Sequence, residues 1–166
     1  MKQKEQLFPA LFTFFASFGV YIYTLAPTVS LWDCGEFIAS SVTLGVPHPP
    51  GAPFYLLIGR FFSMIPFAAD IAFRVNIIAA LSSALTILLL YLIIVLLAKE
   101  FYGEPETLEK KVILYGSGMI GALTFAFTET FWFNATEAEV YSIKGLVGLQ
   151  TLDIANSLVC CLTLLK

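Results

Sequence analysis

VNIIAALSSALTILLLYLIIVLLA, which runs from Val75 to Ala98, decides the fold class of this chain. The stretch contains no charged residue. It exceeds the roughly 20 apolar residues that a helix needs to cross a bilayer. Its hydroxyl side chains, on Ser82, Ser83 and Thr86, can form hydrogen bonds back to the helix backbone. The stretch is therefore predicted to be a transmembrane helix.

The composition of the whole chain agrees with this prediction. Of its 166 residues, 58% are hydrophobic and 13% are charged, whereas a soluble domain carries about 25% charged residues. Aromatic residues make up 15%, which suits a protein with aromatic belts at the membrane interfaces. The net charge is −3, and the sequence has no basic block, which excludes nucleic acid as a partner. We expect an all-α, polytopic transmembrane protein.

Three other apolar segments complete the predicted membrane domain. Residues 8–26 form a run too long for a cleaved signal peptide, so we expect it to be retained as the first span. Residues 112–133 end in an aromatic cluster typical of a membrane interface. Residues 146–165 form a less pure run that polar side chains interrupt. We expect about four spans in one domain, residues 1–166, that is the N-terminal part of a longer protein.

Basic residues near the span ends predict the orientation. With four spans, one side of the membrane receives Lys2, Lys4, Lys99, Lys110 and Lys111. The other side receives Arg60, Arg74 and Lys144. Because lysine and arginine favour the cytoplasmic side, we expect the N-terminus to lie there. The loop 27–74 and the loop 134–144 then share the outer face.

Residues 51–67 can be interpreted in two ways. The segment is apolar, but it is short for a span, contains Arg60 and is bounded by prolines. We expect an interfacial helix that lies on the outer surface. If the segment crossed the membrane instead, Asp33 and Glu137 would lie on opposite sides.

The outer loops concentrate titratable residues. Asp33 and Glu36 are three residues apart in a predicted helix over 29–44, so they share one helical face. Paired carboxylates in an apolar setting are tolerated when they share a proton, a metal or a cationic group of a substrate. His48, the only histidine, lies in the rigid turn P-H-P-P-G. It is either part of a structural elbow or a ligand for a metal or a phosphate.

Other residues also allow a structural and a functional interpretation. Cys34 lies between the two acids, where it is a small packing residue, a metal ligand or a nucleophile. Arg60 and Arg74 are lipid anchors or recognise a phosphate. The motif G-x-G-x-x-G at Gly116 lies inside a predicted span, which favours close helix packing over cofactor binding.

Three motifs, in fixed order relative to the predicted spans, carry a family resemblance. The matching positions are Pro27, Asp33, Gly35, Glu36 and Phe37, then Leu44, Gly45, His48, Pro49, Pro50, Gly51 and Pro53, then Trp132, Glu139, Val140 and Tyr141. In this pattern the chain resembles the N-terminal part of a bacterial membrane family that is related to protein O-mannosyltransferases and includes a eukaryotic transmembrane O-mannosyltransferase.

The resemblance implies a GT-C fold whose active site lies in the first outer loop. Such enzymes transfer a sugar from a polyprenyl-phosphate donor, here to a protein Ser/Thr or another acceptor such as a glycan. By position, Asp33 is the catalytic base and Glu36 its neighbour, whereas Glu139 and Glu137 are acids of a second segment. The substrate-binding candidates are His48, Arg60, Glu137, Glu139 and Tyr141. A divalent cation could assist departure of the phosphate. The location implied is the bacterial inner membrane.

A non-catalytic membrane protein, such as a transporter module or a scaffold, is the alternative. This alternative predicts acids that face a central path between the spans. Glu129 and Asp153, which lie in or near predicted spans, favour it. The transferase predicts instead that the acids of both outer loops lie together on one membrane surface.

Overall fold

The computed structural model describes residues 2–30, 33–49 and 51–150. All regular elements in this part of the chain are helices. They are α1 (Lys2–Thr24), α2 (Cys34–Thr43), α3 (Pro53–Met64), α4 (Ile71–Tyr102), α5 (Leu108–Ala126) and α6 (Glu129–Thr136). Residues 140–150 are helical as well. The expected all-α fold is confirmed.

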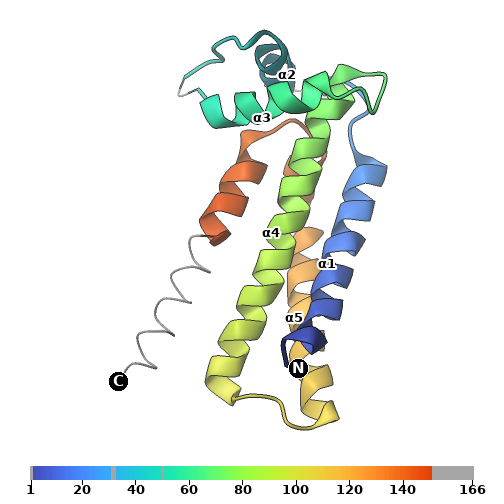
Figure 1. Cartoon of the computed structure of the whole chain (residues 1–166), viewed down its shortest axis with the longest axis vertical. Coiled ribbons are helices and arrows are strands. Elements are labelled where there is room, and N and C mark those ends of the chain that lie inside the picture. The colour runs from blue at the N-terminus through green and yellow to red at the C-terminus, as the bar shows by residue number, and fades with distance from the viewer. Residues whose placement is uncertain (1, 31–32, 50, 151–166) are drawn as a thin grey trace.

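Three long helices form the body of the molecule. Figure 1 shows α1, α4 and α5 running along the long axis, and α4 contacts both of the others. Alanines at the contacts, such as Ala80, Ala84 and Ala122, are fully buried and let the backbones approach closely. The Tyr21 hydroxyl donates to the Ala126 carbonyl across 2.9 Å, which joins α1 to the end of α5.

Two of these helices, Glu5–Thr24 and Ile71–Tyr102, are long and apolar enough to cross a membrane. The structure differs from the uninterrupted helix expected over residues 112–133. Instead, α5 ends at Ala126 and α6 follows at an angle of 69°, and together they count as one further span only if a broken helix is allowed. Thr128 explains the break, because its backbone is extended and its hydroxyl donates to the Phe125 carbonyl.

The span expected at residues 146–165 lies largely outside the described residues. Only its first part, residues 146–150, is described, and that part is helical. The described residues therefore support two or up to three spans, and they leave the expected number of four unconfirmed.

Two short helices cover one end of the bundle. In Figure 1, α3 lies across the end of α4 with α2 above it. The 12 residues of α3 extend about 18 Å, which is short against a hydrocarbon core of roughly 30 Å. Gly59 allows α2 and α3 to pack tightly, because a Cβ atom at this position would lie 2.8 Å from the Cβ atom of Ser41.

Polar side chains fix the connections at this end. The Arg60 guanidinium donates to the Val42 carbonyl near the end of α2. Arg74 donates to the carbonyl of Ser63 in the last turn of α3 at 3.0 Å, and to that of Ala68 in the α3–α4 connection at 2.7 Å. Both arginines thus hold backbone carbonyls, a structural role that the sequence did not indicate.

Asn76 anchors the segment that leaves α1. This side chain is fully buried on α4, and its amide group donates to the carbonyls of Ala26 and Thr28 at 2.9 and 3.2 Å. The Ala26 N–H donates in turn to the Thr136 carbonyl at 3.0 Å. The first loop and the end of α6 are therefore held at the same end of the bundle.

Candidate functional site

Asp33 stands at the start of α2. It occupies the N-cap position, where its side chain makes no capping hydrogen bond. The helix expected over residues 29–44 is therefore too long, because α2 begins only at Cys34. Ser30 instead donates its hydroxyl to the Glu137 carboxylate. The Asp33 carboxylate is left 59% exposed at the surface.

His48 is bound to Glu36 by two hydrogen bonds. Its backbone N–H donates to Glu36 Oε1 at 2.8 Å, and its ring Nδ1 lies 2.7 Å from Glu36 Oε2. Its other ring nitrogen, Nε2, lies 3.9 Å from Asp33 Oδ2. The Pro-rich turn therefore folds back over the first turn of α2 and brings the histidine to both acids.

The contact between Glu36 and His48 changes the pKa of both groups. The hydrogen bond that the Glu36 carboxylate accepts from the ring raises the pKa of His48 above its ordinary value, and the hydrogen bonds that His48 donates lower the pKa of Glu36. The stabilising pair is complete while Glu36 is ionised and His48 is protonated. Its contribution is lost as the pH rises through the raised pKa of His48, or as the pH falls through the lowered pKa of Glu36.

Replacement of Glu36 by glutamine is expected to bring the pKa of His48 back toward the ordinary value, because the largest cause of its increase is the Glu36 carboxylate. The chain contains a single histidine, so an NMR titration of its ring signals is unambiguous. The exposed Glu129 on α6 offers a matched control, since Glu129→Gln should leave the titration unchanged. An equal titration midpoint in Glu36→Gln and the unsubstituted chain would contradict the contact.

A second segment, which begins at Glu137 and is distant in the sequence, contacts the first loop beside Asp33. Glu137, just after α6, is only 7% exposed and accepts hydrogen bonds from Ser30 and from the Cys34 thiol, whose Sγ lies 3.4 Å from Oε2. Burial and the nearby Glu137 raise the pKa of Cys34 to about 12. The thiol is therefore protonated at neutral pH, which fits a packing residue and disfavours a nucleophile.

A small pocket of about 110 Å³ joins the two segments. Asp33 and His48 line it from the first loop, and Glu139, Tyr141 and Lys144 line it from the second. Burial, and then the charges of Asp33 and Glu137, raise the pKa of Glu139. The pocket thus brings carboxylates together with a histidine and a lysine at one end of the bundle.

The residues predicted for the site divide into two groups. The structure brings Asp33, Glu36, His48, Glu139 and Tyr141 to this pocket or its rim, with Glu137 buried beside them. Arg60 lies elsewhere, since its partner Val42 is nine residues along α2 from Asp33, or about 13 Å. Arg60 is therefore not brought to the acid cluster.

Residues 33–150 match the family described as the protein O-mannosyl-transferase TMEM260 N-terminal domain. The chain belongs to this family. The matched range begins at Asp33 itself and includes both acid-bearing segments. The relation to O-mannosyltransferases that the three motifs indicated is therefore confirmed.

Two curated relatives carry the same name. The chain is 32% identical over 133 residues to protein O-mannosyl-transferase TMEM260 of Mus musculus, covering 79% of this chain and 17% of the relative. It is 26% identical over 129 residues to the Dictyostelium discoideum protein of that name, covering 76% of this chain and 14% of the relative. The chain thus spans less than a fifth of the length of these relatives. No solved structure matches it.

Lys144 lines the pocket, although its sequence position did not indicate a role in the site. Its Nζ lies 5.2 Å from the centre of the Tyr141 ring, and both side chains line the pocket. A signal was available, because Lys144 follows Tyr141 by three residues and shares its helical face. The lysine adds the positive charge that was expected from Arg60.

Asp33, Glu36 and His48 are also the described residues that could hold a metal ion at this TMEM260-family site. One ligand atom from each lies within 4.8 Å of the others. Carboxylate oxygens and an imidazole nitrogen suit a divalent cation. Glu36 already accepts two hydrogen bonds from His48, so a metal held by all three residues would share the Glu36 carboxylate with His48.

Proposed function

We propose that the chain contributes the first part of the active site of a membrane glycosyltransferase of the O-mannosyltransferase type. The sugar comes from a polyprenyl-phosphate donor and passes to a protein Ser/Thr or another acceptor. The observation that carries the proposal is the pocket in which Asp33 and His48 meet Glu139 and Tyr141. The names of the two relatives support the same reaction class.

Asp33 acts as the general base in this proposal. A serine or threonine hydroxyl is a weak nucleophile until a carboxylate accepts its proton in the transition state. The acceptor oxygen bonds to the anomeric carbon while the bond from that carbon to the lipid phosphate breaks. The proton passes to Asp33, and the phosphate leaves with the bonding electrons. The displacement is direct, so the configuration at the anomeric carbon inverts.

Positive charge beside Asp33 stabilises the departing phosphate. His48 is more often protonated than a free histidine because Glu36 raises its pKa, and Lys144 lies in the same pocket. A positive charge held where negative charge develops in the transition state lowers the activation barrier for transfer. Glu139 and Tyr141 then bind the sugar or the acceptor from the second segment. Arg60 contributes only indirectly, by holding the end of α2.

The proposed setting is a GT-C-type enzyme in a bacterial inner membrane, with a cytoplasmic N-terminus and the pocket on the outer face. The separation of basic residues supports the orientation in this proposal. Lys99 and Lys111 contact Gln6 and Glu5 near the start of α1, whereas Arg60 and Arg74 lie at the opposite end of the bundle. The end of the bundle that carries Lys99 and Lys111 then faces the cytoplasm.

The transporter or scaffold alternative gains little from the described residues. Between Val75 and Ala98, and again between Val112 and Ala126, the described helices contain no charged residue that could line a central path. Glu129 is exposed in the first turn of α6, beyond the bend. Asp153 lies outside the described residues.

The direct test is sugar transfer in vitro. The full-length protein in detergent is incubated with polyprenyl-phosphate mannose and a Ser/Thr-rich peptide, with and without a chelator. We expect a mass increase of one hexose on the peptide. A parallel reaction with polyprenyl-phosphate glucose tests the choice of sugar. If neither donor modifies a peptide, a lipid or a glycan acceptor, the proposal fails.

A further inference from the structure

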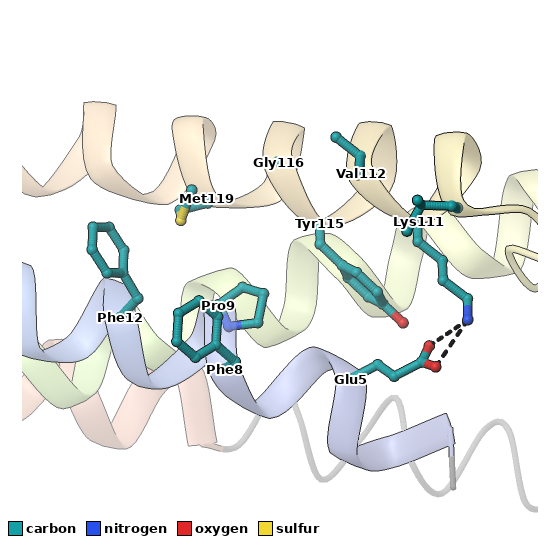
Figure 2. Close-up of a pocket in the computed structure, with 10 residues that line it drawn as sticks. Glu5, Phe8, Pro9, Phe12, Lys111, Val112, Tyr115, Gly116 and Met119 are labelled. Atoms are coloured by element: carbon teal, nitrogen blue, oxygen red, sulfur yellow. Dashed lines mark hydrogen bonds and ion pairs between the residues drawn. The ribbon is translucent and has the colours of Figure 1, made fainter.

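An apolar groove opens between α1 and α5 at the end of the bundle opposite the acid pocket (Figure 2). Its volume of about 630 Å³ lies within the range of about 300–1,000 Å³ that is typical of sites for small molecules. Phe8 and Phe12 line it from α1, and Val112 and Met119 line it from α5. Phe8 and Val112 are 77% and 65% exposed, so the described chain leaves the groove open.

Gly116 enlarges this groove. A Cβ atom at Gly116 would meet nothing within 4 Å, whereas one at Gly118 would approach Val95 to 3.0 Å. The glycines of the G-x-G-x-x-G motif therefore have different roles. Gly118 allows α5 to pack on α4, as the sequence predicted, but Gly116 lines open space in the groove.

Charged and polar groups lie at the rim. Lys111 Nζ is 2.7 Å from Glu5 Oε2, as Figure 2 shows. Pro9, which lies inside α1, has no N–H to donate to the Glu5 carbonyl one turn earlier. The rim thus offers an ammonium group, a carboxylate and a carbonyl oxygen without its usual helical donor. The charges of the ion pair cancel.

We propose that this groove binds a phospholipid whose zwitterionic headgroup carries a primary amine, such as phosphatidylethanolamine. The headgroup ammonium donates to the carboxylate and carbonyl of Glu5, its phosphate accepts from Lys111, and an acyl chain lies between Phe8 and Val112. The apolar α1 and α4 place this rim where the headgroups of a bilayer begin.

The rim chemistry separates this lipid from others. A choline headgroup has no N–H to donate, and an anionic glycerol headgroup brings no positive charge to Glu5. A helix from elsewhere in a longer protein could fill the apolar groove without contacting the Glu5–Lys111 pair at the rim, so a lipid preference that depends on Glu5 distinguishes the two occupants. A charged rim beside an apolar groove therefore favours a lipid, which has a charged headgroup and an apolar acyl chain.

Native mass spectrometry of the 166-residue chain in mild detergent tests the proposal. The chain is offered equal amounts of phosphatidylethanolamine, phosphatidylcholine and phosphatidylglycerol with identical acyl chains. We expect retention of the ethanolamine lipid to exceed that of the others about tenfold, the effect of one charge-assisted hydrogen bond. Glu5→Gln should remove the preference, and Gly116→Leu should abolish retention by filling the groove.

Two matched variants serve as controls. Gly19→Leu adds the same side chain to α1 at an open position outside the groove, and Lys110→Gln removes the neighbouring lysine, which does not line it. Both should retain the lipid as the unsubstituted chain does. Equal retention of the three lipids, no retention of any, or undiminished binding by Gly116→Leu would each overturn the proposal.

Discussion

Asp33→Asn is expected to lower sugar transfer by the full-length protein by about 10²–10⁴-fold, the usual contribution of a general base. Asparagine has nearly the same shape but cannot accept the acceptor's proton. The fold should survive, because the Asp33 side chain makes no capping hydrogen bond, and asparagine is itself favoured at an N-cap. Initial rates with polyprenyl-phosphate mannose and a peptide, measured with a thermal unfolding curve, separate the two effects.

Asp70→Asn is the matched control for this substitution. Asp70 is also an N-cap aspartate, and its carboxylate accepts a hydrogen bond from the Ala72 N–H at 2.7 Å at the start of α4. It does not line the pocket, so we expect transfer close to that of the unsubstituted protein. If Asp33→Asn is as active as Asp70→Asn, Asp33 is not the base.

Asn76→Leu is expected to destabilise the protein. Leucine has the same number and branching of side-chain heavy atoms but cannot donate to the carbonyls of Ala26 and Thr28. A buried acceptor left without a partner costs about 1–3 kcal/mol. This cost falls mainly on the half-buried Ala26, since Thr28 is exposed, and removal of Asn76 Oδ1, which is buried without a partner among the described residues, offsets part of it. Because the two carbonyls belong to the segment that leads to Asp33, the loss should also loosen the candidate site. The unfolding temperature in detergent measures the first effect, and the transfer rate measures the second.

Ser83→Ala on the same helix should behave differently. Among the described residues, the Ser83 hydroxyl is buried without a hydrogen-bond partner, so its removal costs no bond. We expect an unfolding temperature equal to or above that of the unsubstituted protein. If Asn76→Leu unfolds at the same temperature as Ser83→Ala, the anchoring role of Asn76 is wrong.

The helical membrane fold could be predicted because it depends on local composition. An uncharged apolar run such as Val75–Ala98 has few structures available in a bilayer other than a helix. The break at Thr128 could not be predicted in this way. No glycine or proline marks it, and it depends on one hydroxyl bonding back to Phe125 and on packing of α6 against α4.

Part of the candidate site could also be predicted from the sequence, because it depends on local spacing and on the distribution of charge. The spacing of Asp33 and Glu36 indicated a shared face, and the basic residues indicated that both acid-bearing segments lie at one end. The individual partners depend on three-dimensional contacts between distant residues. Arg60 bonds to Val42 rather than facing the acids, and Lys144 supplies the positive charge instead. Which cation reaches a pocket is set by how α2 and α3 cross, and sequence spacing does not report this.

The double hydrogen bond between Glu36 and His48 also decides the form of the imidazole ring. Since Nδ1 faces an ionised carboxylate, it keeps its hydrogen even when the ring is neutral. The lone pair then resides on Nε2, the nitrogen that faces Asp33. The protonated ring that the proposed mechanism uses carries a second hydrogen on Nε2, 3.9 Å from the Asp33 carboxylate. The fold therefore decides which nitrogen of its only histidine gains and loses the proton, and that nitrogen, Nε2, faces the proposed chemistry.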